Sequence, residues 1–226
     1  MAALAAAEPP TPRRGGRPSR EQAALLGDRI LDAATDLFLA EGYGATSIEA
    51  VAQRARISKR TFYHRFPDKA ALFGAVVHRI IQGVRPPPDV PLFEGSGLGE
   101  ILPRLARLAV HASVAPMTLA LTRLMLVEAQ RFPELAAIAA REGSRAEAVR
   151  QIAAILERES SAGRLAIDRP EFAAEQFLSL LITVPQRRAL GLGVPMTGAE
   201  LDRWADDCVN LFLNGCTHWK AGHQSN

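Results

Sequence analysis

Residues 46–66 contain two helix-start patterns, separated by a length of chain that only a short helix can fill. The first pattern, Thr46-Ser47-Ile48-Glu49, is typical of a capping box, in which the Thr46 hydroxyl accepts from the backbone N–H of Glu49. Ser58 supplies the second pattern, at the start of a helix expected over 59–66. Arg56-Ile57 lies between them. The segment therefore predicts two short helices joined by a tight turn.

The rest of the chain repeats the three- and four-residue apolar spacing of amphipathic helices, without the alternation of strands or an internal repeat. Pro116, Pro133 and Pro170 each suit the first turn of a helix. We expect an all-α protein of about nine helices. One follows Thr46, one follows Asp68, and the others span about 21–41, 59–66, 98–114, 116–131, 134–162, 170–188 and 198–219.

In such a helix-turn-helix pair, the second helix presents one face outward and can enter the major groove of DNA. Phe62 and Phe66 are spaced to face inward. The remaining side chains all donate hydrogen bonds to phosphates or base edges, and none is acidic: Lys59, Arg60, Thr61, Tyr63, His64 and Arg65. The alternative is an ordinary amphipathic helix whose basic face is exposed to solvent and binds no DNA. The composition favours a helix that contacts DNA, with Ser58 at its start.

The formal net charge of +3 falls wholly in the first 70 residues, which favours a polyanionic partner for that part alone. Residues 1–20 are rich in Ala, Pro, Gly and Arg, so we expect a disordered basic arm. Within it, Arg13, Arg14 and Arg17 flank glycines, as in arms that enter the minor groove. A merely basic tail is the alternative.

Residues 46–52 (TSIEAVA) and 57–72 (ISKRTFYHRFPDKAAL) together resemble the N-terminal domain of the tetracycline-repressor (TetR) family. The resemblance implies a DNA-binding head over 21–67 and a ligand-binding and dimerisation domain over 68–226. By motif position it implies DNA contacts from Thr61, Tyr63 and His64, a phosphate contact from Lys69 and a place near the DNA backbone for Thr46. Residues 123–135 also resemble the C-terminal body of an AefR-like subgroup.

Arg56 departs from that family pattern, because glycine usually fills this turn position. A left-handed backbone conformation costs a non-glycine residue on the order of 1 kcal/mol. We expect a small strain or a slightly different turn at Arg56, offset by a phosphate contact from its side chain.

The last two predicted helices carry apolar side chains at helical spacing, ending with Cys208, Cys216 and Trp219. A single domain could bury them internally, but the resemblance implies a homodimer interface through 170–219. Pro185 is expected to kink or end the first of these helices. The cysteines have neither redox nor metal-ligand spacing and are expected to be reduced core residues.

The helix expected over 116–131 is apolar nearly all round and is therefore predicted to be central. With its neighbours it suggests a pocket for a small, apolar ligand, although plain core packing is the alternative for any one residue. The predicted lining comprises His111, Met117, Thr118, Leu121, Thr122, Met125, Phe177 and Leu181.

Other classes of protein find little support in the sequence. The five histidines are scattered, and we find no paired carboxylates, phosphate loop or nucleophile with its base, so we expect no enzyme, metal or cofactor. A signal peptide or membrane span is not expected, which favours the cytoplasm. We therefore predict a dimeric transcriptional regulator, a ligand-released repressor of a palindromic operator. A non-specific architectural DNA-binding protein and a regulator without a ligand remain alternatives.

Overall fold

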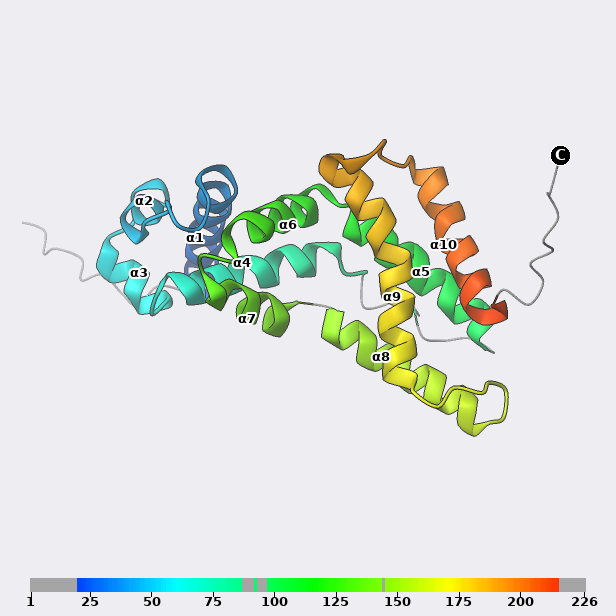
Figure 1. The fold of residues 1–226 in the computed structure, drawn as a ribbon. Helices are drawn as coiled ribbons and strands as arrows, with labels where there is room; N and C mark the ends of the chain where they lie inside the picture. The colour runs from blue at the N-terminus through cyan, green and yellow to red at the C-terminus, as the bar shows by residue number, and fades with distance from the viewer. Residues whose placement is uncertain (1–19, 87–91, 93–96, 144, 216–226) are drawn as a thin grey trace, which may run out of the picture.

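The computed structural model describes residues 20–86, 92, 97–143 and 145–215. Across these residues the chain forms ten α-helices and one short π-helix, and no strand, which confirms the all-α class. The arrangement is elongated (Figure 1). In chain order the helices are α1 (Arg20–Glu41), α2 (Ile48–Arg54), α3 (Lys59–Arg65), α4 (Lys69–Val84), α5 (Leu98–Ser113), α6 (Pro116–Glu128), α7 (Pro133–Glu142), α8 (Arg145–Ser161), α9 (Pro170–Arg187), η1 (Arg188–Leu192) and α10 (Gly198–Asn214).

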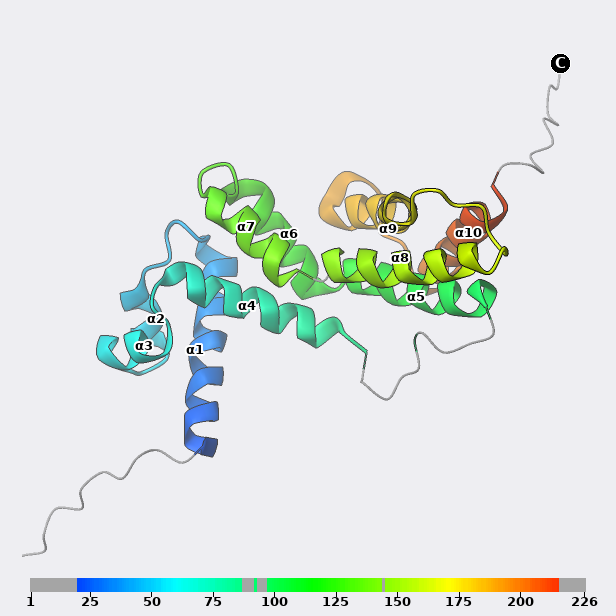
Figure 2. The ribbon, with the colours of Figure 1, turned by 90° about the horizontal axis from the view of Figure 1, so that it is seen from below.

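A first core joins α1–α4 to α6 and α7. Phe38, Phe62 and Phe73 are fully buried in it, and Leu135 reaches the same core from α7. The apolar face of α4 is thus covered by α1 on one side and by α6 and α7 on another. Helix α4 runs from the end of the molecule that carries α2 and α3 toward its centre (Figure 2).

A second core joins α5, α8, α9 and α10. Its fully buried side chains include Ile101, Leu102, Leu156, Phe177 and Leu181. The two cores do not follow the chain order, because α6 and α7 pack with the first core although α5 precedes them. The predicted division at residue 67 would separate α4 and α7 from side chains with which they share a core.

The single helix predicted over 134–162 is wrong, because the chain breaks into α7 and α8 after Glu142. Gly143 takes an extended conformation there, and a Cβ at this glycine would lie 2.2 Å from the carbonyl oxygen of Ala139. The break allows α7 and α8 to pack in different cores, since Ile138 lies in the first core and Leu156 in the second.

The central position predicted for α6 is also wrong. Leu126 and Val127 on this helix are 70% and 77% exposed. Leu119 and Leu124 are its buried apolar residues. An apolar sequence therefore did not indicate burial on all sides.

Pro185 does not end α9, which continues to Arg187 and then into η1. A proline within a helix cannot donate to the carbonyl four residues earlier, here that of Leu181. The Trp204 indole N–H of α10 donates to that oxygen at 3.0 Å. The lost helix bond is thus replaced by a bond between the two helices.

Helix α10 begins with a capping box between Thr197 and Glu200 and ends at Asn214, with Gly215 as its C-cap.

Burial raises the pKa of the Cys208 thiol to about 11, in keeping with a core residue. Cys216, Trp219 and the arm residues Arg13, Arg14 and Arg17 lie outside the described residues. In the part of the chain that the structure covers, no single helix has the length and apolarity to cross a membrane, and the pair α5 and α6 passes that test only together, bent by 61°.

Candidate nucleic-acid interface

Ser47, and not Thr46, caps α2. The Ser47 hydroxyl accepts from the backbone N–H of Ala50 at 3.0 Å. Thr46 is 1% exposed, and its hydroxyl donates to the carbonyl of Gly42 at 2.8 Å. The predicted capping box is therefore wrong, and burial leaves the Thr46 side chain no surface with which to touch DNA.

The turn between α2 and α3 has the hydrogen bonds of a Schellman motif. Arg56 N–H donates to Gln53 at 3.0 Å, and Ile57 N–H donates to Ala52 at 2.9 Å. Arg56 has a φ of 55°, and among the described residues it is the one non-glycine residue with a positive φ. Of the two outcomes expected at Arg56, a strained residue or a different turn, the positive φ corresponds to the strained residue. Its side chain is exposed, and a phosphate contact from it stays a prediction.

Helix α3 is held at both its first turn and its inner face. The Ser58 hydroxyl accepts from the Thr61 N–H at 3.1 Å and shares a hydrogen bond with the Thr61 hydroxyl at 2.8 Å. Phe62 is fully buried, and Tyr63 packs edge-on against it with ring centroids 5.5 Å apart. Such packing fixes the direction in which the outer side chains point.

The outer face of α3 is polar and open to solvent. Tyr63 is 51% exposed although it is aromatic, and Thr61 is half-buried. Arg60 and His64 are exposed, and within the described chain Arg60 forms no ion pair. These four side chains offer hydrogen-bond donors from one short helix, as the sequence predicts.

Two cations near α3 are neutralised by acids from elsewhere in the fold. Lys59 pairs with Glu49 of α2, and Arg54 pairs with Asp36 of α1 at 2.8 Å. The hydrogen bond from Lys59 holds the pKa of Glu49 below its usual range, and the same bond raises the pKa of Lys59. Residues 54–65 contain basic but no acidic residues, yet the acids of α1 and α2 offset part of their positive charge in the folded chain.

Lys69, in the first turn of α4, is bound to the protein itself. Its ammonium donates to the carbonyls of Tyr43 at 2.9 Å and Thr46 at 3.1 Å, and it lies 4.4 Å from the centroid of the Tyr43 ring. Two of its three N–H donors therefore hold the turn between α1 and α2. A phosphate contact stays a prediction for the remaining donor.

That turn also packs against Phe132, which lies between α6 and α7. The ring of Tyr43 lies 5.2 Å from that of Phe132, and a Cβ at Gly44 would be 3.0 Å from Phe132. Burial, with the negative charges of Glu134 and Asp68, raises the pKa of Tyr43 to about 12. Tyr43 thus connects the end of the molecule that carries α2 and α3 to its middle.

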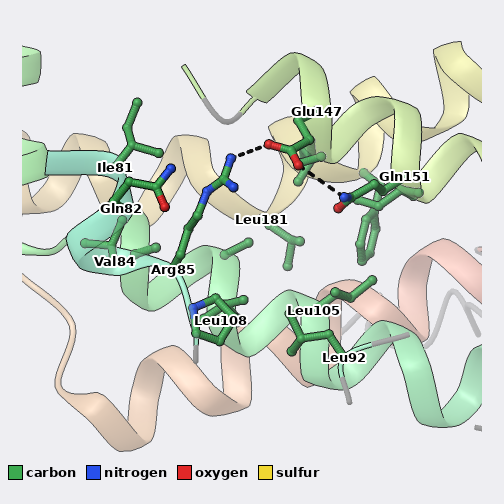
Figure 3. A pocket seen from close by; sticks show the side chains of 17 residues that line it. Ile81, Gln82, Val84, Arg85, Leu92, Leu105, Leu108, Glu147, Gln151 and Leu181 are labelled. Carbon is green, nitrogen blue, oxygen red and sulfur yellow. Dashed lines mark hydrogen bonds and ion pairs between the residues drawn. The ribbon is translucent and has the colours of Figure 1, made fainter. Parts of the chain in front are cut away.

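A cavity of about 800 Å³ lies between α4, α5, α8 and α9 (Figure 3). Phe177 and Leu181 line it, as predicted. The sequence missed the contribution of α4 and α8, because their apolar spacing indicates burial without saying which helices meet. Its wall also includes Ile81, Val84, Leu105, Leu108 and Ile152.

The other six residues predicted to line a pocket do not line this cavity. His111 faces outward and lies 2.8 Å from Asp202. Met117 is 41% exposed, whereas Leu121 and Met125 pack against the first core. Thr118 and Thr122 are on the same helix, where the Thr122 hydroxyl donates to the Thr118 carbonyl at 2.8 Å.

One side of the cavity is polar. Arg85, just after α4, forms an ion pair with Glu147 in the first turn of α8. Gln151 donates to the same carboxylate at 3.4 Å. Figure 3 shows this chain of contacts beside the apolar wall.

Two family descriptions match the chain. Residues 30–76 match the bacterial regulatory proteins of the tetR family, and residues 100–215 match the C-terminal domain of AefR-like transcriptional repressors. The curated relatives include the transcriptional activator FasR of Mycolicibacterium smegmatis, 35% identical over 77 residues that make up 32% of this chain and 34% of that protein. They also include a transcriptional repressor of Mycobacterium tuberculosis, 39% identical over 72 residues that make up 32% of this chain and 37% of that protein. The matches thus span about a third of these relatives' length.

Solved structures match over most of the chain. The flavonoid-responsive regulator FrrA is 33% identical, with a TM-score of 0.70 over 84% of this chain and 96% of that one. A TetR-family transcriptional regulator from Mesorhizobium loti is 30% identical, with a TM-score of 0.68 over 85% and 96%. The protein therefore belongs to the TetR family of bacterial regulatory proteins, and its C-terminal domain is of the AefR-like type.

Proposed function

We propose that this protein is a cytoplasmic, sequence-specific DNA-binding transcriptional regulator and not an enzyme. The observation that carries the proposal is the outer face of α3, where Arg60, Thr61, Tyr63 and His64 are presented by a helix fixed through Phe62. Donors of this kind on the second helix of a helix-turn-helix pair read base edges and phosphates in the major groove. Membership of the TetR family supports the same conclusion.

The regulator acts as a homodimer on a palindromic operator. Four large apolar side chains on or between α9 and α10 are exposed in the single chain: Phe172, Leu192, Val194 and Leu211. A second copy would cover them through the same surface, as two-fold symmetry requires. Two α3 helices then meet successive major grooves about one helical turn apart.

A small, mainly apolar molecule in the cavity releases the DNA. The regulator therefore binds its operator and represses transcription when that molecule is absent. The cavity has the size and the apolar wall of a ligand site. It also lies against α4, the helix that leads to the DNA-contacting end (Figure 2). A ligand that fits another angle of α4 better would shift the two heads out of register.

Selection of binding sites from random DNA by the full chain, followed by footprinting, tests the DNA-binding proposal. We expect one short palindrome to be protected. Protection without sequence preference would instead indicate an architectural DNA-binding protein and would contradict the proposal. A screen for small molecules that release the selected DNA then tests the ligand step, and a regulator without a ligand is its negative outcome.

Arg60→Ala and Arg150→Ala form a matched pair for the selected operator. Both remove one exposed arginine, but Arg60 lies on α3, whereas Arg150 lies on α8, outside the proposed dimer surface and the cavity wall. Loss of a base contact costs about 1–3 kcal/mol of binding free energy, and loss of a phosphate contact lowers the salt slope by about 1. We expect one of these effects for Arg60→Ala and neither for Arg150→Ala.

A further inference from the structure

The described chain packs as two bodies, and the cavity lies where they meet. The first body, α1–α4 with α6 and α7, shares the first core, and the second body, α5 with α8–α10, shares the second. Ile81 and Val84 of the first body form one part of the cavity wall. Leu105, Phe177 and Leu181 of the second body form another. A molecule in the cavity would therefore contact both bodies at once.

The ion pair between Arg85 and Glu147 joins the two bodies at this cavity (Figure 3). Arg85 directly follows α4, and Glu147 lies in the first turn of α8. Both residues line the cavity, with side chains 40% and 38% exposed, so the pair stands between the apolar wall and solvent. The polar group of a bound molecule would meet this pair.

The two partners differ in how easily they leave the pair. An arginine guanidinium is always charged in proteins, and an anion beside that of Arg85 offsets this charge next to the apolar wall. Glu147 already has a second partner, since Gln151 donates to it at 3.4 Å, and it also faces water. Exchange of one anion for another at Arg85 is therefore easier than removal of the anion altogether.

We propose that the cavity accepts an apolar molecule with one anionic group, and that this group takes the place of Glu147 on Arg85. The inference rests on the ligand-released regulator proposed above, and it adds the chemical class of the ligand and the contact that the ligand breaks. Without the Arg85–Glu147 pair, the first body loses an ion pair to the second. Because α3 shares a core with α4, α6 and α7, it moves with the whole first body.

Isothermal titration of the full chain with decanoate, decan-1-ol and decylamine tests the exchange, because these probes share one alkyl chain and differ in charge. Decanoate is expected to bind most tightly. Glu147→Gln removes the competing carboxylate and should bind decanoate about two- to fivefold more tightly, the range for an exposed ion pair, with decan-1-ol unchanged. Arg85→Gln should bring decanoate down to the affinity of decan-1-ol.

Glu157→Gln is the matched control, since it removes the same charge from an exposed site on α8 that does not line the cavity. Its affinity for decanoate should equal that of the wild type. An unchanged or weaker affinity in Glu147→Gln, or tightest binding of decylamine, would overturn this inference while leaving the cavity a ligand site. Failure of all three probes to bind the wild type would overturn the proposed ligand site as well.

Discussion

Arg56 occupies a backbone conformation that glycine adopts at lower cost. Its φ of 55° is imposed by the two hydrogen bonds that close the turn between α2 and α3, and the turn in turn sets the angle of α3. Arg56 lowers the stability of the turn through this strain. In return, it adds a positive charge two residues before the N-cap of α3. The cost and the benefit can be measured separately.

Arg56→Gly should raise the free energy of unfolding by roughly 0.5–1 kcal/mol, because relief of the left-handed strain exceeds the added entropy of the unfolded glycine. Urea denaturation measures this change. The same variant should lower the salt slope of operator binding by roughly 0.9, the value for one phosphate contact. An unchanged slope would show that the Arg56 side chain does not touch the DNA backbone.

Tyr43 gives the junction between the α1–α2 turn and α7 a dependence on alkaline pH. Its pKa rises from 10.0 to about 12 on folding, so the folded chain holds the phenol proton more tightly than the unfolded chain does. The associated stability is complete below pH 10 and is lost as the pH rises toward 12. A shift of this size corresponds to about 2–3 kcal/mol.

Tyr43→Phe removes this titration. Between pH 10 and pH 12, the free energy of unfolding of the wild type should therefore fall more steeply than that of the variant. Urea denaturation at steps of pH measures both curves, and comparison of the two cancels the titration of lysines. Parallel curves would contradict the burial of an ionisable phenol at this junction.

At the scale of the elements, α9 and α10 are joined by a bond that a proline makes possible. Pro185 leaves the Leu181 carbonyl without its helical donor, and the Trp204 indole supplies the missing N–H. Trp204→Phe should cost about 1–3 kcal/mol of unfolding free energy, because a buried carbonyl then lacks a partner.

Pro185→Ala restores a backbone N–H to the same carbonyl, so the loss caused by Trp204→Phe should be smaller in a chain that already carries Pro185→Ala. A double-mutant cycle measured by urea denaturation gives the coupling between the two positions. Additive effects of the two substitutions would rule out the compensation described for this carbonyl.

Local patterns along the chain predicted most element boundaries, but they could not predict which elements meet. The starts of α3, α4 and α10 follow from Ser58, Asp68 and Thr197, whose side chains cap the helices that follow. The break at Gly143 was missed because an isolated glycine is tolerated within a helical pattern. The cavity was misplaced because a three- and four-residue spacing identifies a buried face and not its partner. Lys59 was predicted among the DNA-contacting side chains, and its ion pair with Glu49 was not foreseen because that acid belongs to the preceding helix.

At the scale of the whole molecule, the single chain leaves a hydrophobic surface around α9 and α10 that a second copy would cover. Leu211→Glu places a charge on this surface and should give a monomer, with operator affinity reduced at least tenfold because two linked heads bind cooperatively. Val127→Glu is the control, since Val127 is also exposed but lies on α6. Sedimentation equilibrium should show a dimer for the control. A monomer in both variants, or in neither, would contradict an interface through 170–219.

The two cores alternate along the chain, with α1–α4 in the first, α5 in the second, α6–α7 in the first and α8–α10 in the second. During synthesis, α4 is therefore made before Leu124, Leu135 and Ile138, the side chains that complete its core. Until residue 138 has been synthesised, part of the apolar face of α4 has no partner side chains to cover it. A chimera that takes its DNA-binding helices from one relative and its remaining helices from another would therefore need α6 and α7 from the same protein as α1–α4. A junction placed directly after α4 would divide the first core.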